Sequence, residues 1–263
     1  MTGIPSTMDR LLGLLRDPPA DPDTSAGYLD LLGPSAKPPP SLAQSVMQST
    51  FLPQIYERVW RPIGFNLAKG WPIGPDTATE HAMARDWLGL SHPGRAVRPP
   101  ATVLDVACGP GNVTRALASG VGEGGLVIGL DASETMLTRA VADTSADDIR
   151  YVRGDAVDLP FRDATFDAVC CFGALYLFDD PWTALDGMTR VLKPGGHLVI
   201  LTSRRPLPLP ATRIGATLLR RATGFTTFGD REITTALTDR GYTAVKQRRY
   251  PLMQLVGAQR PNL

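Results

Sequence analysis

Hydrophobic and polar positions follow a regular alternation of two patterns from residue 101 onwards. Short apolar runs occur at ATVLDVA (101–107), LVIGLD (126–131), FDAVCCF (166–172) and HLVILT (197–202). Apolar residues at helical spacing lie between these runs, at about 112–119, 133–143 and 181–192. Apolar strands that alternate with helices indicate a parallel sheet covered on both faces. The pattern therefore predicts a doubly wound α/β fold.

The end of the chain shows a different arrangement. A helical pattern at 230–241 is followed by two strand-like segments, 242–249 and 251–258, with almost no linker between them. Adjacent strands joined by a tight connection must be antiparallel. We therefore predict a Rossmann-like, mostly parallel sheet of seven strands whose last strand is antiparallel.

The first part of the chain predicts a helical extension. Residues 1–40 are rich in proline, and we expect a short helix near 8–16 followed by an irregular arm. Apolar residues at helical spacing continue over 41–70 and include Tyr56 and Trp60, four positions apart. A further helix is predicted at 77–89, with Asp76 or Thr77 as its cap. We divide the chain into an N-terminal arm with helices, 1–76, and a main domain, 77–263.

Composition and charge narrow the class of protein. Hydrophobic residues make up 43% of 263 residues, which is enough for a full core, and the formal net charge of +1 argues against non-specific coating of nucleic acid. The odd number of cysteines and the scattered histidines predict neither a disulfide framework nor a metal site. The chain shows no signal-peptide pattern and no long apolar run, so we expect a cytoplasmic protein.

The segment VLDVACGPGN (103–112) carries the strongest chemical signal. An apolar strand runs into a turn that contains Gly109 and Gly111, and a helical pattern follows. Glycines let the backbone approach a ligand closely and adopt positive φ, and the start of the helix offers unpaired N–H groups to an anion. A tight strand-to-helix turn without any ligand would give the same pattern, so the glycines alone do not distinguish a ligand-binding turn from a purely structural one.

Three carboxylates add to this signal. Asp105 lies at the end of the first strand, and Asp131 ends the next strand, twenty residues after Gly111. A carboxylate in that place can accept both hydroxyls of a ribose. Asp155, in GDAVDLPF (154–161), follows the third strand. Together these positions predict a nucleotide-like ligand at the ends of the strands.

These residues resemble the class I S-adenosylmethionine (SAM)-dependent methyltransferases, particularly the small-molecule branch that includes the ubiquinone and menaquinone C-methyltransferases. The resemblance covers roughly residues 77–260. It is carried in order by DVACGPG, LDASETML, GDAVDLPF, FDAVCCFGALYLFDD and RVLKPGGHLVI. This family resemblance implies SAM as the cofactor and S-adenosylhomocysteine as its product.

The resemblance also implies a role for individual residues. For the methionine part of SAM, Gly109 and Gly111 would line the site beside Ala107, with Asp105 reaching the ammonium group. Cys171 and Phe172 would lie near the transferred methyl group.

The adenosine part of SAM is assigned by the same resemblance. Asp131 would bind the ribose, next to Ala132, and Met136 would pack on the adenine face. Asp155 would accept from the adenine amino group, and the backbone of Ala156 would pair with the ring.

An NAD-dependent dehydrogenase is the obvious alternative for a Rossmann turn. Its fingerprint requires a small residue three positions after the second glycine, where this chain has Thr114. Dinucleotide-binding folds do not need a carboxylate at the position of Asp105. The predicted antiparallel end of the sheet also fits methyltransferases better than NAD-dependent dehydrogenases. We therefore favour SAM over NAD.

The sequence gives fewer signals for the residues that bind the methyl acceptor than for those that bind the cofactor. Methyl transfer from a sulfonium needs an aligned nucleophile more than a general base, and no residue is marked as a base. Tyr176 and His92 are the candidates for catalysis, with a packed tyrosine and a solvated histidine as the alternatives. Tyr56, Trp60 and Tyr176 are candidates for the acceptor pocket. The motif N/D-P-P-Y/F is missing after the fourth strand, which argues against amino groups of adenine or glutamine as substrates.

The region from 204 to 249 is basic, with ten Arg or Lys against three Asp or Glu. We expect a basic helical insertion at about 204–228. Its helix at 211–222 is a candidate for contact with a membrane surface, and a solvated arginine face is the alternative.

We predict from the sequence a methyltransferase that acts on a small lipophilic acceptor by O- or C-methylation, with no nucleic-acid partner. Residues 1–76 would cover the cofactor and the acceptor. The alternatives are a nucleic-acid methyltransferase and a non-catalytic SAM-binding regulatory module. The oligomeric state stays open.

Overall fold

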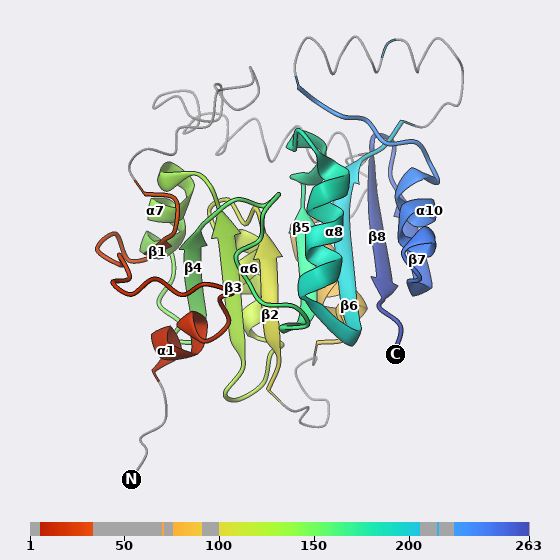
Figure 1. Ribbon diagram of the computed structural model, residues 1–263. Coiled ribbons are helices and arrows are strands. Elements are labelled where there is room, and N and C mark those ends of the chain that lie inside the picture. Colours follow the sequence, from red (N-terminus) through yellow and green to blue (C-terminus); the bar gives the residue numbers. More distant parts are fainter. Residues whose placement is uncertain are drawn as a thin grey trace.

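The structure is a computed structural model, and it describes residues 6–33, 70, 76–90, 100–205, 215 and 224–262. Within these residues a single sheet of eight strands has the order β1-β4-β3-β2-β5-β6-β8-β7 (Figure 1). The strands are β1 (Leu29–Asp30), β2 (Thr102–Val106), β3 (Leu126–Asp131), β4 (Ile149–Arg153), β5 (Phe166–Phe172), β6 (Leu192–Ser203), β7 (Thr243–Arg249) and β8 (Met253–Gln259).

All neighbouring strands pair in parallel except β8, which is antiparallel to both β6 and β7. This confirms the mostly parallel sheet with an antiparallel last strand, but the predicted number of seven strands is wrong, because β1 of the N-terminal segment adds an eighth strand beside β4. The chain builds β2, β3 and β4 outwards in one direction and then continues with β5 on the other side of β2. Ligands of such sheets bind beyond the carboxyl ends of the strands at this switch point.

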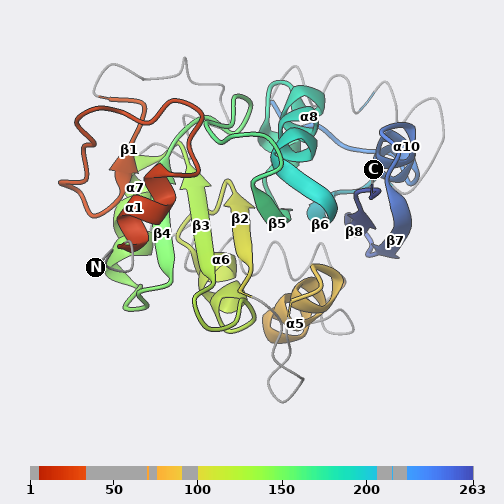
Figure 2. The ribbon, with the colours of Figure 1, turned by 60° about the horizontal axis from the view of Figure 1, so that its bottom comes forward.

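Two layers of helices cover the sheet. The helices are α1 (Thr7–Leu12), α5 (Thr77–Trp87), α6 (Asn112–Ala118), α7 (Glu134–Ala142), α8 (Pro181–Val191) and α10 (Glu232–Asp239), with a short 3-10 turn, η2 (Leu175–Leu177). One hydrophobic cluster joins the sheet to α1, α8 and α10, and a second joins it to α5, α6 and α7. Figure 2 separates the layers, with α8 on one side of the sheet and α5 and α6 on the other.

Local sequence explains where the helices begin. The carboxylate of Asp76 accepts from the backbone N–H of Thr79 at 2.7 Å, so Asp76 is the cap of α5. Asp180 caps α8 in the same way, and Pro181 occupies the first helical position, where its missing N–H has no cost. The helices and strands predicted within 77–205 and 230–258 are confirmed to within a few residues, except that β6 begins at Leu192 and not at 197.

The N-terminal segment packs on the sheet edge. Leu11 of α1 and Leu29 of β1 are fully buried in the core, and β1 pairs in parallel with β4. The short helix predicted near 8–16 is confirmed as α1, but β1 lies where the sequence pattern predicts an irregular arm, because a strand of two residues has no periodicity to detect. The helices predicted within 41–70 and at 211–222 lie outside the described residues.

Candidate functional site

The glycine turn after β2 adopts a left-handed backbone. Ala107, Gly109 and Gly111 have φ values of 55°, 54° and 76°. A side chain at Gly111 would collide with the hydroxyl of Tyr151, which lies behind the turn. Only glycine fits at this position, for reasons of both conformation and space. Glycine at this position therefore allows the tight turn at the carboxyl end of β2.

Asp131, at the end of β3, is bound to this turn. Its Oδ2 accepts a hydrogen bond from the backbone N–H of Gly109 at 2.8 Å, and its Oδ1 accepts from the N–H of Ser133 at 2.9 Å. The residue is only partly buried. Because each carboxylate oxygen has further lone pairs, Asp131 can still accept from hydroxyls of a ligand.

Asp105 is buried beneath the same turn, with 1% of its surface exposed. Thr114 donates its hydroxyl to Oδ2 at 2.7 Å, and the thiol of Cys170 donates to Oδ1 at 3.4 Å. Burial raises the pKa of Asp105 to about 6, although these two hydrogen bonds act in the opposite direction. The role of Asp105 toward an ammonium group stays a prediction.

Thr114 and Cys170 are site residues that the sequence reading does not assign. Thr114 lies on α6 and is fully buried, and Cys170 lies on β5, which pairs with β2 beside Asp105. The sequence signal for Thr114 is a hydroxyl side chain in the first turn of the helix that follows the glycine turn.

The residues predicted for the adenosine part gather beyond the ends of β3 and β4. Met136 is buried on the first turns of α7, and Ala132 is exposed before it. Asp155 is exposed, and one of its oxygens accepts from the N–H of Val157 at 2.8 Å. Ala156, next to it, is half-buried. The sheet thus brings these residues to the same edge as Gly109 and Asp131.

Arg153, the last residue of β4, organises this region and is also not predicted from the sequence. It is only 5% exposed, and its guanidinium lies 2.8 Å from Asp30 and 3.0 Å from Glu134. It also donates to the carbonyl of Ala132 at 3.3 Å. A buried cation with several acceptors fixes the segment that carries Asp131, Ala132 and Met136.

The end of β5 borders the site on its other side. Cys171 is fully buried on the face that packs with α8, whereas Phe172 packs on the opposite face. Beyond them, the ring of Tyr176 stacks on Phe225, with 5.6 Å between the centroids, and the N–H of Thr226 donates to the Tyr176 carbonyl. The sequence reading assigns Tyr176 but not its aromatic partner Phe225.

Comparison with known proteins bears on this arrangement. A family model described as "Methyltransferase domain" matches residues 104–200. The match runs from β2 to β6 and includes the glycine turn, Asp131 and the end of β5. The demethylmenaquinone methyltransferase of Bacillus licheniformis is 46% identical over 107 residues, which are 40% of this chain and 46% of that protein. The chain spans about half the length of the curated relatives that it matches.

Solved structures share the fold of this chain. A SAM-dependent methyltransferase from Mesorhizobium loti is 22% identical, with 70% of this chain and 99% of that chain covered and a TM-score of 0.55. The [4+2]-cyclase SpnF is 17% identical, with 80% and 95% covered and a TM-score of 0.58. Such distant likeness shows the fold alone, and the fold accommodates more than one reaction.

Three residues predicted for the acceptor side of the site, Tyr56, Trp60 and His92, lie outside the described residues. The sequence also predicts no metal site, and within the described ranges no group of three His, Cys, Asp or Glu side chains could hold a metal ion. In the same ranges, no helix has the length and apolar composition needed to cross a membrane.

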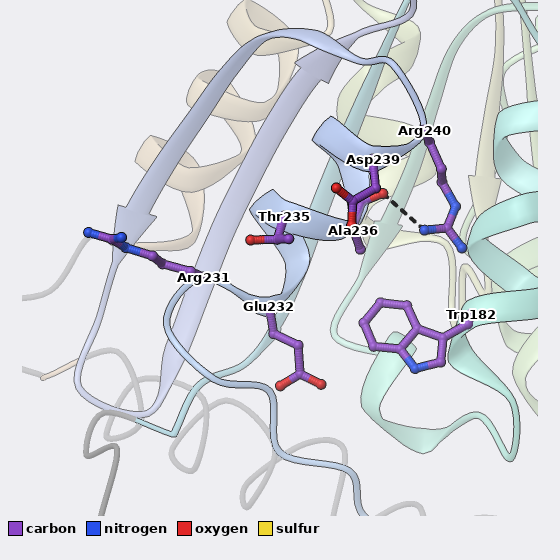
Figure 3. A pocket seen from close by; sticks show the side chains of 7 residues that line it. All are labelled: Trp182, Arg231, Glu232, Thr235, Ala236, Asp239 and Arg240. Atoms are coloured by element: carbon purple, nitrogen blue, oxygen red, sulfur yellow. Dashed lines mark hydrogen bonds between the residues drawn. The ribbon is translucent and has the colours of Figure 1, made fainter.

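Two cavities lie away from the glycine turn. One, of about 510 Å³, lies between α8 and α10 and combines the Trp182 ring with charged side chains of both signs (Figure 3). Arg240 connects the two helices that form its walls, because it donates to the carbonyl of Ala236 on α10 and pairs with Asp186 on α8. The other, of about 330 Å³, lies at the amino ends of β2 and β5 and includes the Asp167–Lys193 ion pair.

Proposed function

We propose that this protein is a SAM-dependent methyltransferase that acts on a small lipophilic acceptor by O- or C-methylation. The observation that carries the proposal is the contact between Asp131 and Gly109, which places a hydrogen-bond-accepting carboxylate beside a bare backbone turn at the switch point of the sheet. The likeness of 107 residues of this chain to a demethylmenaquinone methyltransferase supports a lipophilic acceptor.

The residues at this edge fit the cofactor. Gly111 packs on the hydroxyl of Tyr151 at a φ of 76°, so a glycine here keeps the tight turn from which backbone N–H groups can reach a ligand. Asp131 retains acceptor capacity for ribose hydroxyls, and Met136 offers an apolar side chain for the adenine face. Asp155 is exposed and keeps one oxygen for the adenine amino group. These assignments, with those of Ala107, Ala132, Ala156, Cys171 and Phe172, are proposals.

When bound, SAM supplies a methyl group already activated on a sulfonium. The protein's task is to hold the acceptor atom in line with the carbon–sulfur bond and to exclude water. We propose the Tyr176–Phe225 pair as a wall of the acceptor pocket, because both rings lie beyond the end of β5. Tyr176 and His92 are the candidates for proton removal, where the acceptor requires it.

The N-terminal residues complete the proposed organisation. We propose that 1–76 contributes a cover and 77–263 the catalytic domain, with a basic insertion at 204–228. The helix 211–222 is proposed to contact a membrane surface, in a cytoplasmic protein without a nucleic-acid partner.

Thermal unfolding with SAM or S-adenosylhomocysteine tests the proposal. A ligand at a hundred times its dissociation constant adds about 2.7 kcal/mol, which raises the midpoint by roughly 5–10 °C in a chain of this size. We expect the shift in the wild type and its loss in Asp131→Ala. Glu123→Ala, which removes an exposed carboxylate from a turn, is the control that should keep the shift.

A screen of acceptors with labelled SAM then tests catalysis. Methyl transfer to a quinol or phenol-like lipid, reduced in Tyr176→Ala at unchanged SAM affinity, is the expected result. SAM binding without transfer to any acceptor would support a regulatory module instead. The absence of a thermal shift with either ligand in folded protein would overturn the proposal.

A further inference from the structure

The turn between β7 and β8 exposes apolar side chains. Pro251 and Leu252 occupy its tip, and the N–H of Tyr250 donates to the carbonyl of Met253 at 2.8 Å across it. Leu252 is 56% exposed, and it is the one exposed large hydrophobic residue found in the described part of the chain. A single exposed aliphatic side chain is common on protein surfaces, so Leu252 indicates a partner only together with the residues around it.

Arg204, just after β6, holds this turn in place. Its backbone N–H donates to the carbonyl of Leu252 at 2.7 Å, and its guanidinium donates to the carbonyl of Tyr250 at 2.7 Å. The same guanidinium pairs with Asp230 at 2.6 Å. The tip is therefore presented by a fixed backbone, and little conformational freedom is lost when it binds.

Three exposed arginines lie in the segments that adjoin the tip. Arg248 and Arg249, at the end of β7, are both exposed, and Arg231 is exposed at the start of α10. Figure 3 shows Arg231 extending away from the cavity, toward β7. Within the described residues no ion pair engages these three side chains, since the nearby Asp230 is bound to Arg204. We call Arg231, Arg248, Arg249, Pro251 and Leu252 the turn surface.

The turn surface lies on the same edge of the sheet as the proposed cofactor site. Met253 pairs with Ser203 at the carboxyl end of β6, so the turn extends beyond that edge (Figure 1). From β2, which carries the glycine turn, β8 is three strands away through β5 and β6. At about 4.8 Å per strand, this places the two roughly 14 Å apart.

We propose that the turn surface binds an anionic lipid bilayer, with Leu252 inserted at the interface and the three arginines on the headgroups. An apolar tip with cations in the adjoining segments matches the two components of a bilayer interface, which are the apolar acyl chains and the negatively charged headgroups. Single-stranded nucleic acid would use the cations but would require aromatic side chains for base stacking, and the tip is aliphatic.

The membrane contact also implies an orientation of the site relative to the bilayer, and the meaning of this orientation rests on the proposed function. With the turn surface on the bilayer, the carboxyl edge and its glycine turn face the membrane, where a lipophilic acceptor dissolves. The membrane contact through β7 and β8 is independent of the helix 211–222.

Sedimentation with vesicles tests this proposal in the full chain. We expect binding to vesicles of phosphatidylcholine with phosphatidylglycerol, little binding to phosphatidylcholine alone, and release by salt. The double variant Arg248→Gln/Arg249→Gln should bind about thirty-fold more weakly, since each cation near an anionic surface contributes a factor of about five. Leu252→Ser should bind roughly tenfold more weakly.

Arg162→Gln is the matched control, because it removes an exposed cation near the start of β5, at the opposite edge of the sheet. The control should bind as the wild type does, and all variants should keep the thermal shift with SAM. Equal binding of the wild type and the double variant, no binding of the wild type to anionic vesicles, or tighter binding to an oligonucleotide would each overturn the proposal. Vesicle binding without a SAM shift would retain this surface and reject the proposed function.

Discussion

The guanidinium of Arg153 lies 2.8 Å from the carboxylate of Asp30 and joins the N-terminal strand β1 to the end of β4. The same guanidinium donates to Ala132, the residue after the proposed ribose-binding Asp131. Residues 6–33 are thus connected to the adenosine end of the site through one buried side chain. The N-terminal segment is in this respect a part of the site's scaffold.

Replacing Arg153 should therefore weaken both folding and SAM binding. Arg153→Met leaves Asp30 partly buried without its partner, and removal of one member of a buried ion pair costs about 3–5 kcal/mol. We expect a loss near the lower figure, measured by urea unfolding, because Glu134 is exposed and can be solvated. Calorimetric titration should show weaker SAM binding.

The surface ion pair between Arg139 and Asp143 provides the comparison. Both side chains are more than a third exposed, so Arg139→Met should change the unfolding free energy by less than about 1 kcal/mol and leave SAM affinity unchanged. Equal effects of Arg153→Met and Arg139→Met would show that Arg153 has no special positioning role.

The backbone at Gly111 gives a second prediction. Gly111→Ala places a Cβ against Tyr151 and forces an alanine to φ 76°, so the turn must move. We expect a loss of about 1–3 kcal/mol in stability and the disappearance of the SAM-induced thermal shift.

Gly124→Ala separates these two effects. Gly124 has a φ of 73°, and its nearest contact for an added Cβ is Pro100 at 3.9 Å, in a turn before β3. The backbone strain is similar, but the turn lies at the amino edge of the sheet. This variant should lose about 1 kcal/mol and keep its SAM shift, and loss of the shift here would remove the argument for a local effect at Gly111.

The fold was predictable because the central strands β2, β3 and β5 are largely apolar and helices such as α5 and α8 carry clear signals at their starts. The runs 126–131 and 166–172 coincide with β3 and β5. The positions of Gly109 and Asp131 relative to those strands were enough to predict that they meet. The role of Arg153 was not predictable, because its partners Asp30 and Ala132 are brought to it by tertiary packing, and β1 is too short to show a period. The contact of Phe225 with Tyr176 was not predictable for a similar reason, since it joins segments that lie far apart in the sequence.

Asp105 should make stability depend on pH. Burial raises its pKa from the ordinary 3.8 to about 6, so the folded state binds a proton more tightly than the unfolded state. Stability from this group is therefore fully present below pH 4, falls as the pH rises to about 6, and stays reduced above it, by about 3 kcal/mol in total.

The variant Asp105→Asn isolates this effect from the other carboxylates. It is neutral at every pH, so its stability relative to the wild type should rise across the same interval, as measured by urea unfolding at several pH values. SAM should bind it more weakly if Asp105 reaches the ammonium group. A stability difference that does not change between pH 4 and 6 would contradict the raised pKa.

The three thiols should be unreactive in the folded protein. Cys108, Cys170 and Cys171 are all buried, and loss of solvent raises the pKa of each thiol above its usual range. The nearby carboxylate of Asp105 raises it further, because a thiolate beside a negative charge is disfavoured. Since the thiolate is the reactive form, a disulfide reagent at neutral pH should titrate no thiol in the native state and all three in urea. Rapid reaction of one thiol without denaturant would show that the site opens, and protection of that thiol by SAM would place the opening at the glycine turn.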